Sequence, residues 1–246
     1  DMARSVGMLG KTTVGLIRSS VASFDNSAMF TQGGRVVLNP FFWKPWAKSA
    51  AYSWKALVSE KLALGEQLNM EGSALWGVAE QAGLHINRSY GKLQRHEDVF
   101  SAETIDYINK LTHNKGPVVA ITGLPTLGIS ASNRAMQGFT NSLRLRMFEN
   151  LVGAVGGVDK VAPEELSNIA NIINNLTGRA TGKGEAVGNY LGHIFFSGHF
   201  TASGPQVYIQ RPLEAAASLV GAGPLAKSHW KVRAAAASGI VSVVGS

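Results

Sequence analysis

The sequence predicts an all-α fold: an extended multi-helix assembly with long connecting loops and little or no sheet. Apolar side chains recur at helical spacing in several stretches of the chain. Of the 246 residues, 45% are hydrophobic and 16% are charged, which excludes intrinsic disorder because disorder requires low hydrophobicity and high charge. The β-branched run Val118 to Ile121 could form a short strand, but no second strand is apparent to pair with it.

The first half of the chain contains irregularly spaced helices. Four are expected, over residues 11–24, 47–64, 69–82 and 101–111. Asn39-Pro40 breaks the chain before the second of these helices. Six residues that begin just before this helix and run through it follow helical spacing: Trp46, Ala50, Trp54, Leu57, Lys61 and Leu64. Gly83 is expected to cap the third helix at its C-terminus and Ser101 the fourth at its N-terminus. Residues 112–128 are interpreted as a connector.

The second half contains the strongest helix, over residues 130–155. Its stripe follows i, i+3, i+7, i+11, i+15 and i+19: Met136, Phe139, Leu143, Met147, Leu151 and Val155. A second helix is expected to begin at Pro163, a good first residue with two acids in its first turn, and to end near Leu176 before Gly178. A third is expected over 185–196. Two short helices follow in the Ala-rich tail, separated at Gly223-Pro224.

These breaks divide the chain into four segments. They are an N-terminal segment 1–39, a helical region with an aromatic cluster 40–128, a helical core region 129–204, and an Ala-rich C-terminal segment 205–246. No long apolar run follows the start Asp1-Met2, so no secretory signal is expected. The leading Asp1 and the internal Met2 indicate numbering that begins inside a longer chain.

The sequence excludes several kinds of catalytic and metal site and favours none. The absence of cysteine rules out disulfides, thiolate zinc sites and iron–sulfur clusters. No histidine pair has metalloprotease spacing, and Gly10-Lys11-Thr12 lacks the first glycine of a phosphate-binding loop. The loop from Gly178 to Gly184 could cradle an anion, although a plain helix–helix connection explains its glycines better. We therefore expect no enzyme, catalytic residue, cofactor or metal.

Candidate contact residues come from an aromatic run and from scattered basic side chains. The run Phe41 to Trp46 is interleaved with lysine, which suits core packing, a subunit interface, single-stranded nucleic acid or a membrane surface. The net charge of +7 is modest, so the arginines form either a solvated helix face or a contact with DNA. The candidates for interface or nucleic-acid contact are Phe42, Trp43, Trp46, Arg134, Arg144, Arg179 and Lys183.

Several short motifs occur in a characteristic order. They are Ser23-Phe24-Asp25-Asn26-Ser27 with Gln32-Gly33, the stretch 40–54, Ala82-Gly83-Leu84, residues 97–100, residues 131–135 with Phe139, Leu143-Arg144 and Phe148, residues 169–174, residues 176–179, and Phe195-Phe196-Ser197 before Ala202-Ser203. In this order, residues from about 20 to 212 resemble a conserved helical region of large polyvalent proteins of tailed bacteriophages and prophages. The chain departs from that pattern at Gly198-His199 and Gly204, where the family usually has arginine.

The resemblance implies a non-enzymatic structural protein of a phage particle. It implies a segment of an internal or ejection protein that oligomerises near the portal or tail and accompanies DNA delivery. Its partners would be further copies of itself and other virion proteins (portal, tail or internal). Non-specific contact with DNA and contact with the host membrane are compatible with the same role. Its place would be inside the capsid or tail, with delivery to the host envelope on infection. The alternatives are a membrane-active module and a helical accessory part of a phage-encoded enzyme.

Overall fold

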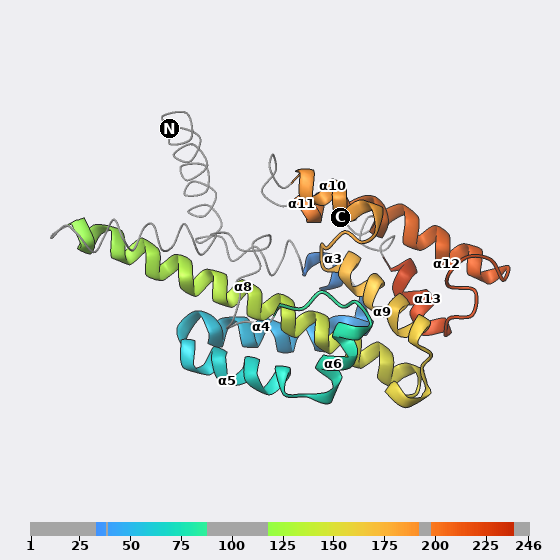
Figure 1. Ribbon diagram of the computed structural model, residues 1–246, viewed down its shortest axis with the longest axis horizontal. Coiled ribbons are helices and arrows are strands. Elements are labelled where there is room, and N and C mark those ends of the chain that lie inside the picture. The colour runs from blue at the N-terminus through green and yellow to red at the C-terminus, as the bar shows by residue number, and fades with distance from the viewer. Residues whose placement is uncertain (1–32, 38, 88–117, 192–197, 239–246) are drawn as a thin grey trace.

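The computed structural model describes residues 33–37, 39–87, 118–191 and 198–238. Within these ranges 79% of the residues are helical and none forms a strand, which confirms the all-α prediction (Figure 1). The helices expected over 11–24 and 101–111 lie outside the described residues.

The first described helices are separated by serine caps. They are α3 (Gly34–Val37), the 3-10 turn η1 (Pro40–Phe42), α4 (Trp43–Val58), α5 (Glu60–Glu71) and α6 (Ala74–Gln81). Ser59 is extended and its hydroxyl accepts from the Leu62 amide, and Ser73 does the same for Trp76. Each hydroxyl satisfies an amide that a helix start leaves without a partner. The expected boundaries 47–64 and 69–82 were therefore wrong, because the chain turns at these two serines.

Helix α8 (Val118–Val155) runs for 38 residues and forms a long rod beside α4 (Figure 1). The strand considered at 118–121 was wrong, and so was the connector over 118–128, because both stretches are helical. A lone strand would leave its backbone groups unpaired, whereas a helix pairs them locally. The predicted stripe is confirmed in its centre, where four of its side chains are buried: Phe139, Leu143, Met147 and Leu151.

The C-terminal half begins after the Gly156-Gly157 turn. Its elements are the 3-10 turn η2 (Val158–Lys160), α9 (Pro163–Leu176), α10 (Lys183–Leu191), α11 (Gly198–Pro205), the π-helical turn η3 (Gln206–Gln210), α12 (Arg211–Leu219) and α13 (Trp230–Ala237). The start at Pro163 is confirmed, and Gly178 takes a φ of 84° at the end of α9. The break between two short tail helices is also confirmed, with positive φ at Gly221 and Gly223.

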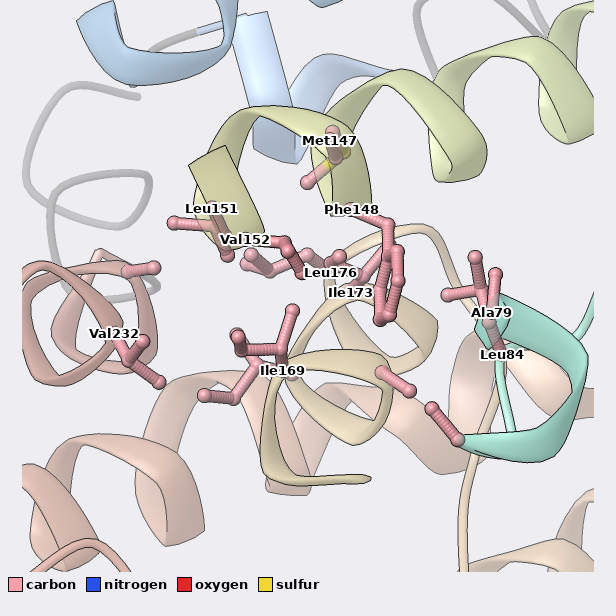
Figure 2. Close-up of a cluster of buried hydrophobic side chains, with 14 of the residues drawn as sticks. Ala79, Leu84, Met147, Phe148, Leu151, Val152, Ile169, Ile173, Leu176 and Val232 are labelled. Carbon is pink, nitrogen blue, oxygen red and sulfur yellow. The ribbon is translucent and has the colours of Figure 1, made fainter. Parts of the chain in front are cut away.

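The main core is a cluster of buried side chains that draws on residues from Val36 to Ala236. A second, smaller cluster consists of Tyr52, Ala56, Ala63 and Ala135. Figure 2 shows α9 side chains meeting those of α8, with Ala79 and Leu84 on one side and Val232 on the other. Helix α9 thus lies at the centre of the packing. The expected division between residues 128 and 129 falls inside the continuous helix α8.

Candidate interaction surface

Aromatic side chains at η1 point both into the core and out of it. The Asn39 side chain caps the turn by accepting from the Phe41 amide at 3.0 Å, and Pro40 is the first residue of the turn. In this tight turn Phe42 is fully buried in the core, whereas Phe41 and Trp43 are exposed. The short turn therefore divides one aromatic run between the interior and the surface.

The far end of the chain brings a second tryptophan to the same place. Trp230 begins α13, and its ring lies edge-on to that of Phe41, with the centroids 6.5 Å apart. The Lys231 ammonium lies 5.6 Å from the Trp230 ring centroid, within cation–π range. Phe41, Trp43, Trp230 and Lys231 are called here the aromatic surface.

Polar contacts hold the two segments of the aromatic surface in position. The Asn150 amide donates to the Phe41 carbonyl at 3.3 Å, and the Trp43 indole donates to the Val37 carbonyl. Before Trp230, Glu165 accepts from the His229 amide at 3.0 Å and from the Ser228 hydroxyl. The exposed rings are thus attached to α8 and α9.

Two of the predicted aromatic contact residues are in different environments from Trp43. Phe42 is 0% exposed and belongs to the core of this chain, so its assignment as a surface contact was wrong. Its burial follows from the geometry of η1, which turns it toward the other core side chains. Trp46 is half-buried and packs against the same core.

The predicted basic residues do not form one patch. Arg134 donates to the Ala56 carbonyl at 2.7 Å, with Glu60 at 3.9 Å. Arg179 is 8% exposed and pairs with Glu185 at 3.1 Å. Lys183 is exposed at the start of α10. The arginines are therefore used largely within the chain, and the three residues lie on different elements.

Arg144 was wrongly expected to face DNA or a partner. Its side chain is 2% exposed and donates to the Thr177 hydroxyl at 2.8 Å and to the His85 carbonyl at 2.6 Å. Burial is tolerated because the guanidinium is hydrogen-bonded in the interior. Arg144 is thus a structural link between α8, α9 and the segment after α6.

That segment, residues 83–87, begins with a turn at Gly83, has no regular secondary structure after it, and is held by side chains. The Asn174 side chain donates to the Gly83 carbonyl and accepts from the His85 amide, both at 2.9 Å. The Asn141 side chain donates to the Asn87 carbonyl at 2.7 Å and accepts from the Asn87 amide at 2.9 Å. These amides satisfy backbone groups that would otherwise be costly to bury.

The glycine-rich loop 178–184 serves as a helix–helix connection. The Gln206 side chain accepts from the Thr181 amide at 3.0 Å and donates to the Thr181 carbonyl at 2.8 Å. Asn175, fully buried, donates to the Arg179 carbonyl at 3.0 Å and accepts from Arg211 at 2.8 Å. A side chain of η3 therefore occupies the Thr181 amide that an anion would need, which supports the simpler interpretation of this loop.

Sequence reasoning identified Trp43 but missed Trp230. The signal was present, because Trp230-Lys231 repeats the Trp43-Lys44 pairing of aromatic and lysine. Spacing along the chain could not show that Trp230 comes to lie against Phe41 in the fold.

Among the residues that the structure describes, no group of histidine, aspartate and glutamate side chains is arranged to hold a metal ion. None of the described helices is both long enough and apolar enough to cross a bilayer. Comparison with protein-family models, curated proteins and solved structures finds no match to the chain.

Proposed function

We propose that this chain is a non-enzymatic structural protein of a bacteriophage particle, a segment of an internal or ejection protein. It assembles as a homo-oligomer near the portal or tail and accompanies the DNA into the cell. The observation that carries the assembly role is the aromatic surface. The phage context comes from the ordered motifs between residues 20 and 212.

The aromatic surface has the composition of an energetic centre of an interface. Phe41, Trp43 and Trp230 are 43%, 58% and 54% exposed. Tryptophan is among the residues most enriched where truncation to alanine costs the most binding free energy. Large exposed apolar groups that lie together mark sites of association.

The aromatic surface is also held in place before any partner arrives. Its two segments are tied to α8 and α9 through Asn150 and Glu165. A surface that is already ordered loses less conformational entropy on binding. The hydrogen bonds therefore favour association as well as folding.

The assembly role is tested by the concentration dependence of the chain's mass in solution, measured by light scattering after size exclusion. Phe41→Ala and Trp230→Ala are each expected to raise the dissociation constant of the oligomer about 30-fold, the effect of losing about 2 kcal/mol at an interface centre. Leu213→Ala, which is 64% exposed on α12 and outside the aromatic surface, is the matched control. A monomer at all concentrations, or equal effects of all three variants, contradicts the assembly role.

The place in the virion is tested by mass spectrometry of purified particles of a phage whose genome encodes the chain. Peptides abundant in full particles and depleted after DNA release would support a protein that leaves with the genome. Their absence from both full and emptied particles contradicts a virion function.

A further inference from the structure

Helix α4 exposes large apolar side chains as well as its lysines. Its buried side consists of Pro45, Ser49, Tyr52, Ser53 and Ala56, whereas Trp54 is 54% exposed and Val58 is 83% exposed. The Ser53 hydroxyl donates to the Ala135 carbonyl at 2.9 Å. A helix at a protein surface normally buries its apolar stripe and exposes its polar side.

The exposed side of α4 is divided into an apolar strip and a lysine edge. At about 100° per residue, the apolar strip covers roughly 80° of the helix and consists of Trp43, Ala47, Ala51, Trp54 and Val58, all exposed. The next part of the circumference, about 40° wide, carries the three exposed lysines of α4: Lys44, Lys48 and Lys55. The apolar strip and these lysines are called here the outer face of α4.

Charge on this helix has one sign. Helix α4 contains three lysines and no acidic residue. Lys55 lies 3.5 Å from Glu66 of α5, and neither Lys44 nor Lys48 forms an ion pair with another described residue. The outer face therefore presents positive charge beside apolar area, which complements an anionic surface with an apolar layer beneath it.

The opposite side of α4 packs against α8 through small side chains and one aromatic ring. The small side chains are Ser49, Ser53 and Ala56 on α4 with Ala135 and Ser142 on α8, and the Tyr52 ring lies against Gly138. The Ser49 and Ser142 hydroxyls lie 3.1 Å apart across the contact. This side of α4 is therefore used within the chain, which leaves the outer face for a partner.

We propose that the outer face of α4 docks on the surface of an anionic lipid bilayer. The helix lies in the plane of the membrane, with Trp54 and Val58 at the boundary between headgroups and acyl chains, while Trp43 at its start remains part of the aromatic surface. Tryptophan concentrates at that depth. The lysines contact anionic headgroups while their aliphatic stems cover the edge of the apolar strip.

The spacing of the tryptophans favours lipid over single-stranded nucleic acid. Trp43 and Trp54 are about 16 Å apart along the helix axis, whereas proteins that bind single strands present aromatic rings on which successive bases stack. Between them lie Ala47 and Ala51, which offer no ring for a base to stack on. An aliphatic strip of this kind suits acyl chains.

Flotation of the full chain with vesicles tests this proposal. The wild type is expected to float with vesicles of equal parts phosphatidylglycerol and phosphatidylcholine, and to bind pure phosphatidylcholine much more weakly. Lys44→Glu combined with Lys48→Glu should weaken binding at least 25-fold, since each lysine near an anionic membrane contributes about fivefold. Trp54→Glu should weaken it about tenfold or more, because it puts a charge in the apolar strip. Leu213→Glu on α12 is the matched control and should float like the wild type.

Three results would overturn the proposal. The first is no flotation of the wild type with the anionic vesicles. The second is equal flotation of Trp54→Glu and the wild type, which would assign any lipid contact to another face. The third is a wild type that does not bind vesicles but binds oligothymidylate, with the oligothymidylate binding lost in Trp54→Glu. That result would assign this face to nucleic acid. Circular dichroism shows that each variant remains folded, since every substituted side chain is exposed.

Discussion

Helices α4 and α9 both carry apolar residues at helical spacing, yet they distribute them differently. Helix α9 buries Ile169 and Ile173, which Figure 2 shows, and it exposes Glu164. Helix α4 buries Ser53 beside Tyr52 and exposes Trp54. The comparison teaches that periodicity shows where an apolar face lies on a helix, but not which way that face points.

The partner helix decides the direction. Toward α9, α8 presents large side chains such as Phe148 and Leu151, which fill the space beside the isoleucines. Toward α4 it presents Gly138 and Ser142, and a Cβ at Gly138 would lie 3.1 Å from the Tyr52 ring. The glycine leaves room for the Tyr52 ring, so this aromatic residue of α4 turns inward together with Ser49 and Ser53.

The largest difference in stability is expected between a truncation in the core beside α9 and a truncation on the exposed side of α4. Phe148→Ala removes a fully buried ring beside α9 and should lower the free energy of unfolding by about 3–5 kcal/mol. Trp54→Ala should change it by less than about 0.5 kcal/mol, as for an exposed position. Urea denaturation followed by circular dichroism measures both. Comparable losses in the two variants would contradict the exposure of Trp54 on α4.

The next effect concerns the polar link between α8 and α9. Arg144→Leu removes the donors to the Thr177 hydroxyl and the His85 carbonyl and should cost about 2–3 kcal/mol. Arg146→Leu is the control, because Arg146 is only half-buried and donates to Ser142 on its own helix. Thermal melting of the two variants distinguishes them. Equal melting temperatures would show that the interior link contributes nothing to stability.

The smallest effect lies in the contact between α4 and α8. Ser53→Ala removes one hydroxyl donor to the Ala135 carbonyl and should lower the free energy of unfolding by about 1 kcal/mol. Ala51→Ser, on the exposed side of α4, should leave it within about 0.5 kcal/mol of the wild type. Chemical denaturation measures both, and a stabilised Ser53→Ala would contradict a hydrogen-bonded contact.

Much of the fold could be predicted where local signals agree. Pro163 with two acids after it, the isoleucines of α9, and Gly178 after its end all indicate the same helix, and the structure has it. The breaks at Ser59 and Ser73 were missed, because a serine inside an apolar stretch marks a helix start only when its hydroxyl is free to cap. The early start of α8 was missed because β-branched residues also occur in helices when packing supports them.

The candidate surface was predictable in its chemistry and not in its geometry. The aromatic–lysine run identified Trp43, but the run alone could not show that Phe42 turns inward while Phe41 meets Trp230. The arginines were misjudged for a similar reason. Arg144 has the same side chain as a surface arginine, and only its hydroxyl and carbonyl partners in the fold make it an interior residue.

The most direct test is thiol labelling of single-cysteine variants, which is clean because the chain has no cysteine of its own. Trp54→Cys is expected to react with a disulfide reagent nearly as fast as a free thiol, and Ser53→Cys, one residue away, at least about 100-fold more slowly, since reaction requires local opening of the contact with α8. Fast labelling at position 53 with protection at position 54 would contradict the account, because it would mean that α4 buries Trp54 and exposes Ser53.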